Sequence, residues 1–287
     1  MDKKPSEDIE FGLGILEGLK SLTKKYSASG MPLLAKCLKD GSKLILIPAG
    51  EFTMGSPEGK GYKDEHPQHK IYLDAYYIGK YEVTNEQFAR FVRETDYRAY
   101  AERKSNIWKV DLWNTYYNSG TADHPVICIT WEDAVAYCKW AGLRLPTEAE
   151  WEKAVRGTDG RKYPWGKEWD KKRCNWWKGP NLSGMADLNN SRGTLPVGSF
   201  PGGTSPYGCM DMLGNVWEWC GDWYGENYYK NSLQSNPEGP ESDSYRVVRG
   251  GSWGTNYPVR LRCAYRGGDY PVIGGLNCGF RVARSMR

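Results

Sequence analysis

The sequence of 287 residues lacks the features that mark several common functional classes. No apolar run reaches 18 residues, so we expect no membrane-spanning helix in this chain. Lys and Arg are scattered without a run of five, and the net charge is only +4, so we expect neither nucleic acid nor an anionic membrane surface as a partner. No two cysteines form a Cys-x-x-Cys pair, which argues against a zinc cluster.

Cysteine spacing leaves two interpretations open. The chain has eight cysteines, and an even number suits disulfides in an exported protein as well as buried, reduced thiols. Residues 1–5 do not lead into an apolar secretory stretch. The chain therefore reads either as a cytoplasmic protein or as the mature form of an exported one.

A second absence is confined to the C-terminal tail. Residues 254–278 contain no Lys, Glu, Gln, Met or Trp. The first four of these types make up 51 of 287 residues, so 25 positions should hold four or five of them. The tail is instead rich in Gly, Tyr, Asn, Thr and Asp, a composition typical of recognition surfaces. The alternative is a Gly-rich loop that merely lacks long side chains.

The residues that are present indicate an irregular fold. Aromatic residues reach 14% of the chain, with 13 Trp and 20 Tyr, while the hydrophobic fraction is only 39%. Burial must therefore depend on aromatic rings, whose N–H and O–H groups need hydrogen-bond partners. Together with 34 Gly and 16 Pro, this composition predicts a loop-rich protein with many side-chain hydrogen bonds.

The apolar pattern predicts two parts, an extension (residues 1–42) and a main domain (residues 43–287). Ile15, Leu16, Leu19 and Leu22 recur at helical spacing, so we expect a helix in the extension. In the main domain, short apolar and aromatic runs predict strands at residues 44–48, 52–54, 70–81, 217–223, 245–249 and 259–266.

Three helices are predicted from capping boxes that begin at Thr84, Thr130 and Thr147. In each box the Thr hydroxyl can accept a bond from a free backbone N–H, and an acidic or amide side chain three residues later can return it. Gly142 and Gly157 are expected to end the second and third helices.

Several separated motifs resemble one family. They include Gly214-Asn215-Val216-Trp217-Glu218-Trp219 and Gly250-Gly251-Ser252-Trp253, with further matches at residues 47–55, 81–85, 144–152, 163–166 and 279–281. Together, in collinear order over about residues 43–284, they resemble the formylglycine-generating enzyme (sulfatase-modifying factor) family. The resemblance implies an α+β, C-type-lectin-like fold with little regular structure and long ordered loops.

Catalysis is not expected, because the family's copper ligands are missing. Enzymes of this family bind copper through two cysteines, spaced Cys-x4-Cys, just after the Gly-Gly-Ser-Trp/Tyr segment. Here the first cysteine after that segment is Cys263, which matches a later, non-catalytic position. A Thr hydroxyl or a Pro ring cannot replace a thiolate for Cu(I). Sulfoxide-synthase relatives need a three-His iron site on an extra domain, whereas this chain has only His66, His69 and His124. We therefore predict no catalytic cofactor and no enzyme activity.

The tail also resembles the variable region of proteins diversified by retroelements, of which the treponemal variable protein is an example. In those systems mutated adenines diversify asparagine-type codons, which cannot reach Lys, Glu, Gln, Met or Trp. Residues 254–278 obey that restriction and lie at the family's variable position. The resemblance implies a variable region at about residues 246–284.

A strand at residues 259–266 would point Arg260, Arg262 and Arg266 toward scaffold carboxylates and leave Leu261 and Tyr265 free for a partner. The predicted ligand-binding residues are Gly254, Thr255, Asn256, Tyr257, Val259, Leu261, Tyr265, Gly267, Gly268, Asp269, Tyr270, Val272, Ile273, Gly274 and Leu276.

The family resemblance also implies structural calcium. One site maps to the side chains of Asp211 and Glu218 with the carbonyls of Gly214 and Val216, a donor set that suits a hard cation. The alternative is that these two carboxylates cap turns or pair with arginines. A second, looser site maps to Asn175, Trp176, Asn189 and Ser191.

The sequence as a whole predicts a non-catalytic, receptor-like protein that binds an unknown protein or glycan through its variable tail. We expect it at the cell surface or outside the cell. Two alternatives remain: a formylglycine-generating-type oxidoreductase acting on cysteine, and an accessory or structural protein of the same family.

Overall fold

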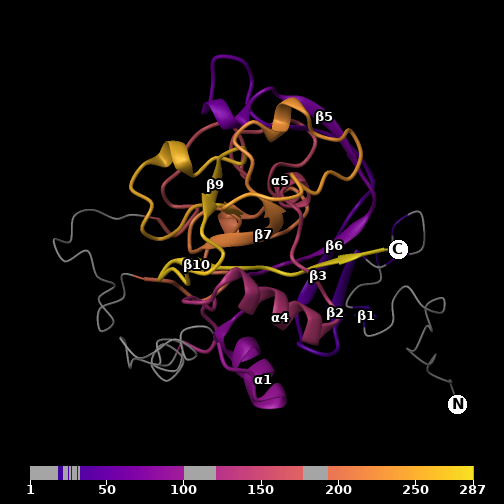
Figure 1. Ribbon diagram of the computed structural model, residues 1–287, viewed down its shortest axis with the longest axis vertical. Coiled ribbons are helices and arrows are strands. Elements are labelled where there is room, and N and C mark those ends of the chain that lie inside the picture. Colours follow the sequence, from indigo (N-terminus) through magenta and orange to yellow (C-terminus); the bar gives the residue numbers. More distant parts are fainter. Residues whose placement is uncertain are drawn as a thin grey trace, which may run out of the picture.

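The computed structural model describes residues 19–21, 25, 27, 31, 33–99, 121–176 and 193–286. Within these residues, long loops join three sheets and three α-helices (Figure 1). The strand orders are β1-β2-β3-β6-β11, β10-β7-β8-β9 and β4-β5. The strands are β1 (Leu19–Ser21), β2 (Leu34–Cys37), β3 (Lys43–Ile47), β4 (Gly50–Met54), β5 (His69–Leu73), β6 (Tyr76–Gly79), β7 (Trp217–Trp223), β8 (Arg246–Arg249), β9 (Arg266–Asp269), β10 (Cys278–Gly279) and β11 (Ala283–Ser285). The helices are α1 (Asn85–Thr95), α4 (Trp131–Ala141) and α5 (Glu148–Arg156).

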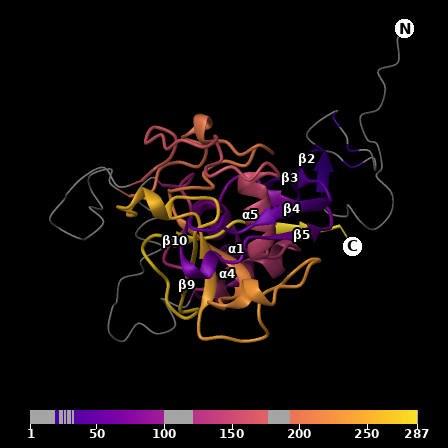
Figure 2. The same ribbon diagram turned by 90° about the horizontal axis from the view of Figure 1, so that it is seen from above.

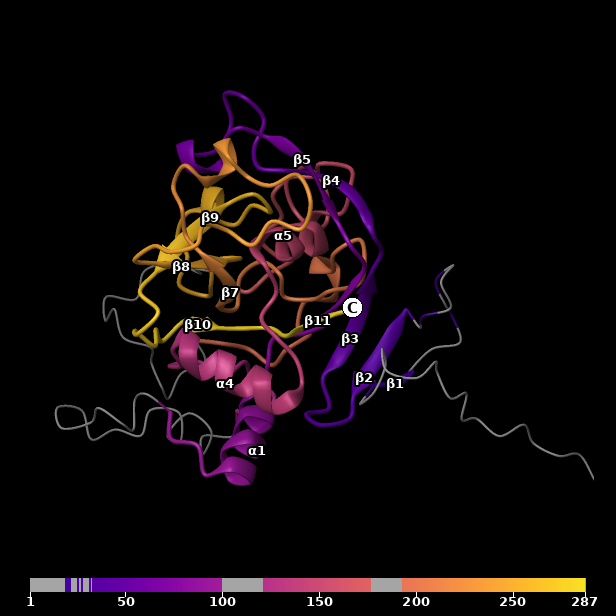
Figure 3. The same ribbon diagram turned by 45° about the vertical axis from the view of Figure 1, so that its right-hand side comes forward.

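The central strand β3 separates two hydrophobic cores. Leu44 and Leu46 pack in the core that contains residues of α1 and α4. Ile45 and Ile47 pack in the other core, which contains residues of α5. Because successive strand residues point to opposite faces, a continuous apolar run is what a strand buried on both faces requires. In Figure 3 the segment from β10 to β11 runs between the helices, with α1 and α4 below it and α5 above it.

The three predicted helix starts are confirmed. Thr84, Thr130 and Thr147 are the N-caps of α1, α4 and α5, and each forms a reciprocal capping box. Helix α4 ends at Gly142 in a left-handed conformation and α5 ends at Gly157, as predicted. Local capping chemistry was therefore enough to locate these boundaries.

The described residues of the N-terminal extension do not form the predicted helix. Leu19–Ser21 is the strand β1, which pairs antiparallel with β2, while Ile15, Leu16 and Leu22 lie outside the described residues. Pairing with the free edge of β2 satisfies the backbone groups of this short segment, so tertiary context overrides the helical spacing. Strand β2 precedes Lys43 yet pairs with β3 in the same sheet.

The predicted strand at residues 70–81 is two strands. Strand β5 pairs with β4, whereas β6 pairs with β3 and β11 in the larger sheet. The break lies at Asp74 and Ala75, where Asn236 accepts a bond from the Asp74 N–H at 2.9 Å and donates one to its carboxylate at 3.0 Å. A contact from a residue 162 positions away therefore divides the run.

The predicted strand at residues 259–266 is wrong. Pro258–Arg260 is a 3-10 turn, and the strand β9 begins only at Arg266. Four successive residues, 261–264, are buried, a pattern that a strand with one solvent-facing side does not produce. Proline lacks a backbone N–H and fixes its own φ, which favours the turn.

All eight cysteines lie in the described part of the chain, and each is a buried thiol outside a disulfide. Burial raises the pKa of Cys128 and of Cys174 to about 12. The sequence left disulfides and buried, reduced thiols open, and the structure contains the buried thiols. No helix among the described residues is long and apolar enough to cross a membrane.

Candidate functional site

The tail is held at both ends by buried arginines. Arg249, at the end of β8, donates to Glu148 and to Glu152, each at 2.7 Å. Arg281 donates to both carboxylate oxygens of Glu218, at 2.5 and 2.6 Å. Both guanidinium groups are completely buried, and removing Arg281 would leave the Glu218 carboxylate buried without an ion pair. The segment between them therefore starts and ends at fixed points.

Two further arginines fix the middle of the tail. Arg262 donates to both oxygens of Glu65 at 2.7 and 2.6 Å. Arg266 donates to both oxygens of Glu148 at 2.7 and 2.6 Å. The prediction that these two anchor the tail to scaffold carboxylates is confirmed. For Arg260 it is wrong, since this residue is exposed and lies 5.7 Å from the centre of the Tyr257 ring.

A tight turn at the start of the tail requires glycine. Gly251 has φ +74°, and a Cβ there would lie 2.5 Å from Leu261. Thr255 is buried and accepts a hydrogen bond from the Ser252 N–H at 2.9 Å, and Leu261 is completely buried. Thr255 and Leu261 were predicted to contact ligand. They belong to the support of the tail instead, because neither presents a side chain to solvent.

The rest of the tail is rich in exposed apolar side chains. Eleven large hydrophobic side chains are exposed in the described part of the chain, and six of them fall within residues 257–276. These six, called the tail patch below, are Tyr257, Val259, Tyr270, Val272, Ile273 and Leu276. Asn256 and Gly268 are also exposed, while Gly254, Tyr265, Gly267, Asp269 and Gly274 are half-buried. Contiguous exposed hydrophobic side chains mark interaction surfaces more often than scattered ones do.

A groove of about 630 Å³ adjoins this patch. Four tyrosines line it, and we call it the tyrosine groove: Tyr62, Tyr224, Tyr245 and Tyr265. Gly267 and Gly268 form part of its wall, where a Cβ on Gly268 would lie 2.9 Å from the ring of Tyr224. The Tyr245 and Tyr270 hydroxyls are 3.0 Å apart, which connects the groove to the tail patch.

The sequence did not point to three of these tyrosines. Tyr62 precedes a short 3-10 turn, Tyr224 follows β7, and Tyr245 precedes β8. The high tyrosine content was the only available signal, and it names no position. The fold brings these segments beside the tail, as the Tyr62–Tyr265 ring distance of 5.5 Å illustrates.

Cys263 is a tail residue whose side chain does not reach the surface. It is completely buried, and burial raises the pKa of its thiol to about 12. A protonated, enclosed thiol is neither a nucleophile nor a ready metal ligand. Its backbone carbonyl accepts a bond from Arg249 at 2.6 Å, which gives this position a structural role.

At the first expected calcium site, both carboxylates already accept hydrogen bonds from the protein. Both oxygens of Glu218 accept bonds from Arg281, and Oε2 also accepts from the Trp151 indole at 2.8 Å. Asp211 accepts from the Gly198 N–H at 2.5 Å. Glu218 therefore pairs with an arginine, which was the alternative to a role as calcium ligand. No cluster of three His, Cys, Asp or Glu side chains among the described residues is arranged to hold a metal.

A nearby carboxylate has an oxygen without a hydrogen-bond partner. The Oε1 atom of Glu82 is buried without a hydrogen-bond partner. Burial, together with Asp211 and Glu218, raises the pKa of Glu82 well above its ordinary value, and burial raises the pKa of Asp211 to about 6. A bound cation would stabilise the charged forms of these acids.

At the second expected calcium site, the Asn175 amide donates to the Gly193 carbonyl at 3.0 Å and to Asn215 at 3.1 Å. The Trp176 indole donates to the Lys171 carbonyl. Asn189 and Ser191 lie outside the described residues.

The three histidines contact different groups. His66 lies 2.7 Å from the Lys60 carbonyl, His69 lies 2.8 Å from the Pro67 carbonyl, and His124 lies 2.9 Å from the Thr194 hydroxyl. They do not form an iron site in the described structure.

The fold, with its short strands and long ordered loops around buried arginines, is the C-type-lectin-like fold that the motifs implied. The Sulfatase-modifying factor enzyme 1-like domain matches residues 32–286, and the chain belongs to this family, that of the formylglycine-generating enzymes. The prediction of the family is confirmed.

Similar proteins carry different names. The formylglycine-generating enzyme of Streptomyces coelicolor is 37% identical over 284 residues, covering 83% of this chain and 88% of that protein. The inactive C-alpha-formylglycine-generating enzyme 2 of Bos taurus is 32% identical, covering 84% and 87%. The serine/threonine-protein kinase pkn1 of Chlamydia caviae is 38% identical over 255 residues, which are 86% of this chain but only 38% of that protein.

Among solved structures, variable protein 1 of Treponema denticola aligns with a TM-score of 0.63 at 23% identity, covering 85% of this chain and 95% of that one. This likeness confirms the shared fold.

Proposed function

We propose that this protein binds a partner, without chemistry, through the tail patch and the tyrosine groove. The observation that carries the proposal is the concentration of six of the eleven exposed large hydrophobic side chains within residues 257–276. Buried ion pairs hold this same segment at Arg249, Arg262, Arg266 and Arg281. A fixed backbone that presents exposed aromatic and aliphatic side chains loses little entropy on binding.

The apolar character of the patch favours a protein partner over a glycan. Tyr257, Val259 and Ile273 offer contact area with few hydrogen-bonding groups, which suits a hydrophobic interface core. The tyrosine groove beside it supplies the hydroxyl groups. A glycan remains the second possibility, since aromatic rings also stack on sugars.

We further propose that a retroelement diversifies the tail and that the protein is displayed at the cell surface. The absence of Lys, Glu, Gln, Met and Trp from residues 254–278 supports the first statement. The separation of roles in the tail also supports it: exposed positions are free to vary, while Arg262 and Arg266 are buried supports.

Deep sequencing of the 3′ end of the gene across one population tests this proposal. We expect substitutions at exposed codons such as Asn256, Tyr257 and Tyr270, and unchanged codons at Arg262 and Leu261. A tail as invariant as the rest of the gene would overturn the diversification.

An oxidoreductase of the formylglycine-generating type is the competing function, because the similarity to named enzymes of this family is substantial. Residues 254–262 contain no cysteine, and Cys263 is enclosed. We expect no copper-dependent oxidation of a cysteine-containing peptide by the purified protein. Turnover of such a peptide would replace the binding proposal with this one.

We also propose that a structural calcium ion binds beside Asp211. The unpartnered oxygen of Glu82 and the raised pKa of Asp211 support a cation there. The backbone carbonyls of Gly214 and Val216 would complete the oxygen ligands, while Glu218 stays paired with Arg281. Such an ion would brace the loop that precedes β7.

A further inference from the structure

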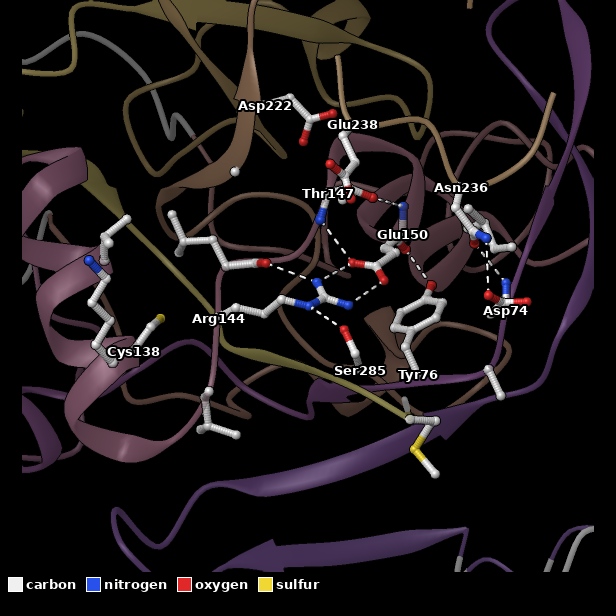
Figure 4. A pocket seen from close by; sticks show the side chains of 18 of the residues that line it. Asp74, Tyr76, Cys138, Arg144, Thr147, Glu150, Asp222, Asn236, Glu238 and Ser285 are labelled. Carbon is white, nitrogen blue, oxygen red and sulfur yellow. Dashed lines mark hydrogen bonds and ion pairs between the residues drawn. The ribbon is translucent and has the colours of Figure 1, made fainter. Parts of the chain in front are cut away.

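A second cavity is lined by residues outside the tail. It has a volume of about 440 Å³ and lies among the β5–β6 connection, α4, the start of α5, the end of β7 and β11 (Figure 4). None of its lining residues belongs to residues 254–278. In Figure 2 the strands β9 and β10 lie on the left and the C-terminus on the right. The cavity still borders the tail at one point, because the backbone N–H of the lining residue Trp131 donates to the Pro271 carbonyl at 3.1 Å.

One ion pair in this cavity is complete by itself. Arg144 donates to both oxygens of Glu150, at 2.6 and 2.7 Å, and Figure 4 shows this pair across the middle of the cavity. Arg144 also donates to the Ser285 hydroxyl at 2.8 Å and to the Leu145 carbonyl at 3.0 Å. These two groups therefore neutralise each other and need no ligand.

Asp222 differs from this pair. Its side chain lines the cavity and is 4% exposed. One oxygen accepts a bond from the Glu148 N–H at 2.8 Å, at the first turn of α5. No Lys, Arg or His among the described residues forms an ion pair with it. A buried carboxylate without an ion pair is unusual in a folded protein.

Arg246 is a cation whose charge interacts with Asp222, since burial lowers the pKa of Arg246 to about 10 and Asp222 opposes that shift. The Arg246 guanidinium lies between two indole rings, 3.7 Å from the centre of Trp131 and 3.5 Å from that of Trp223. It donates to the Gly221 carbonyl at 2.7 Å. This stacked arrangement holds the guanidinium in cation–π contacts instead of in an ion pair with Asp222.

The cavity as a whole is acidic and partly apolar. Four carboxylates line it, from Asp74, Glu150, Asp222 and Glu238, against the two cations Lys139 and Arg144. Apolar lining comes from Leu73, Trp131, Val135, Leu143, Leu145 and Met286. Its volume is that of a small-molecule site, where apolar walls bury the ligand and a few polar groups orient it.

We propose that this cavity binds a small organic cation, a protonated amine carried on an apolar body, with Asp222 as its counter-ion. The ammonium group would lie at Asp222, near the rim carboxylate of Glu238. The apolar body would extend along Leu143, Leu145 and Met286. The proposal does not rest on the binding role of the tail.

The electrostatics of Asp222 agree with this assignment. Burial, together with Glu148 and Glu150, raises its pKa well above the ordinary value of an aspartate. A cation paired with Asp222 would stabilise its charged form and bring that pKa down. An anionic ligand would meet the same repulsion that already acts between these carboxylates.

Titration calorimetry of the full chain with 2-phenylethylammonium tests the proposal. The probes for comparison are 2-phenylethanol, which lacks the charge, and 3-phenylpropionate, which reverses it. We expect saturable binding of the amine, at least tenfold weaker binding of the alcohol and no binding of the acid. Equal affinity for amine and alcohol, or no saturable binding of the amine, would overturn the proposal.

Two variants locate the site. Asp222→Asn preserves the size of the side chain and an acceptor for the Glu148 N–H, and it should weaken amine binding at least tenfold. Glu238→Gln changes an exposed rim residue, and it should weaken binding several-fold. Wild-type affinity in the folded Glu238→Gln and Asp222→Asn proteins would exclude this cavity.

A matched control separates the cavity from the tail. The variant Tyr257→Ala/Tyr270→Ala removes two exposed rings of the tail patch. It should bind the amine as the wild-type protein does. Loss of amine binding in this variant would move the site to the tail and overturn the assignment to the cavity.

Discussion

Arg262 forms two parallel hydrogen bonds with Glu65, at 2.7 and 2.6 Å, although the two residues are 197 positions apart in the chain. Arg262 is 6% exposed and Glu65 is completely buried. The pair ties the centre of the tail to the turn after β4. The segment that carries the exposed tail side chains is therefore supported by a contact between residues far apart in the sequence.

Replacing Arg262 with Met should destabilise the protein by about 3–5 kcal/mol, because Glu65 would remain buried without a cation. Urea unfolding followed by tryptophan fluorescence measures the change. Arg260→Met is the matched control, since Arg260 is exposed two residues away, and it should be nearly neutral. A similar loss in both variants would mean that the Glu65 pair is not the cause.

Replacing Gly251 with Ala should destabilise the tail by two separate effects. The left-handed conformation costs an alanine about 1–2 kcal/mol. The contact with Leu261 adds about 1–3 kcal/mol of overpacking. Gly142→Ala isolates the first effect, because its φ is +69° and nothing lies within 4 Å of the added Cβ. Equal losses in the two variants, measured by urea unfolding, would show that Leu261 gives way freely.

Thiol titration should find eight reactive cysteines after unfolding without reductant, and almost none in the native protein. All eight thiols are buried, and burial raises the pKa of Cys263 to about 12, so the native protein offers few thiolates. Ellman's reagent with and without guanidinium measures both values. Fewer than eight thiols in the unfolded chain would indicate disulfides that the structure does not contain.

Calcium should raise the unfolding temperature, since an ion that binds only the folded state contributes about 2.7 kcal/mol at a hundred times its Kd. Differential scanning fluorimetry with calcium or with EGTA compares the two states. Asp211→Asn should lose the response, while Asp243→Asn, at an exposed position, should keep it. An identical melting curve in EGTA and in calcium would remove the calcium site.

Lys153 should make stability depend on pH. Its ammonium group donates to the Pro48 and Gly50 carbonyls at 2.7 and 2.9 Å, and burial lowers its pKa to about 8. Between this value and its unfolded value of about 10.4, the unfolded chain binds more protons, so the free energy of unfolding rises with pH.

The measurement compares the wild-type protein with Lys153→Met by urea unfolding at pH 7, 8, 9 and 10. The difference should shift in favour of the wild-type protein by up to about 3 kcal/mol across that window. The other titrating groups are common to both proteins and cancel. A difference that stays constant with pH would show that Lys153 has an ordinary pKa in the folded state.

Sequence patterns predicted the local elements of the domain well. The capping boxes at Thr84, Thr130 and Thr147 located the three helices, because a cap depends on residues within one turn of each other. The arginine anchors at 262 and 266 were also predicted. The strand expected at residues 259–266 was wrong, because alternating residue types there reflect partners in distant segments and not a pleated backbone.

The tyrosine groove and the acidic cavity could not be predicted from local sequence patterns. Tyr62, Tyr224 and Tyr245 lie in three unrelated segments, and nothing near them in the sequence distinguishes them from the other tyrosines. Asp222 likewise belongs to an ordinary strand pattern. It forms no ion pair with Arg246, whose guanidinium stacks between two tryptophans in a contact between separate elements.

The sequence by itself determined the family, the helix caps and the tail that lacks five residue types, since each depends on residue identity at short spacing. Only the tertiary structure decided which tail residues are exposed. Leu261 and Thr255 are buried, whereas Val259 and Tyr257 point to solvent. Burial depends on which distant segments pack beside a residue, and the ion pairs from Glu65 and Glu148 set that packing here.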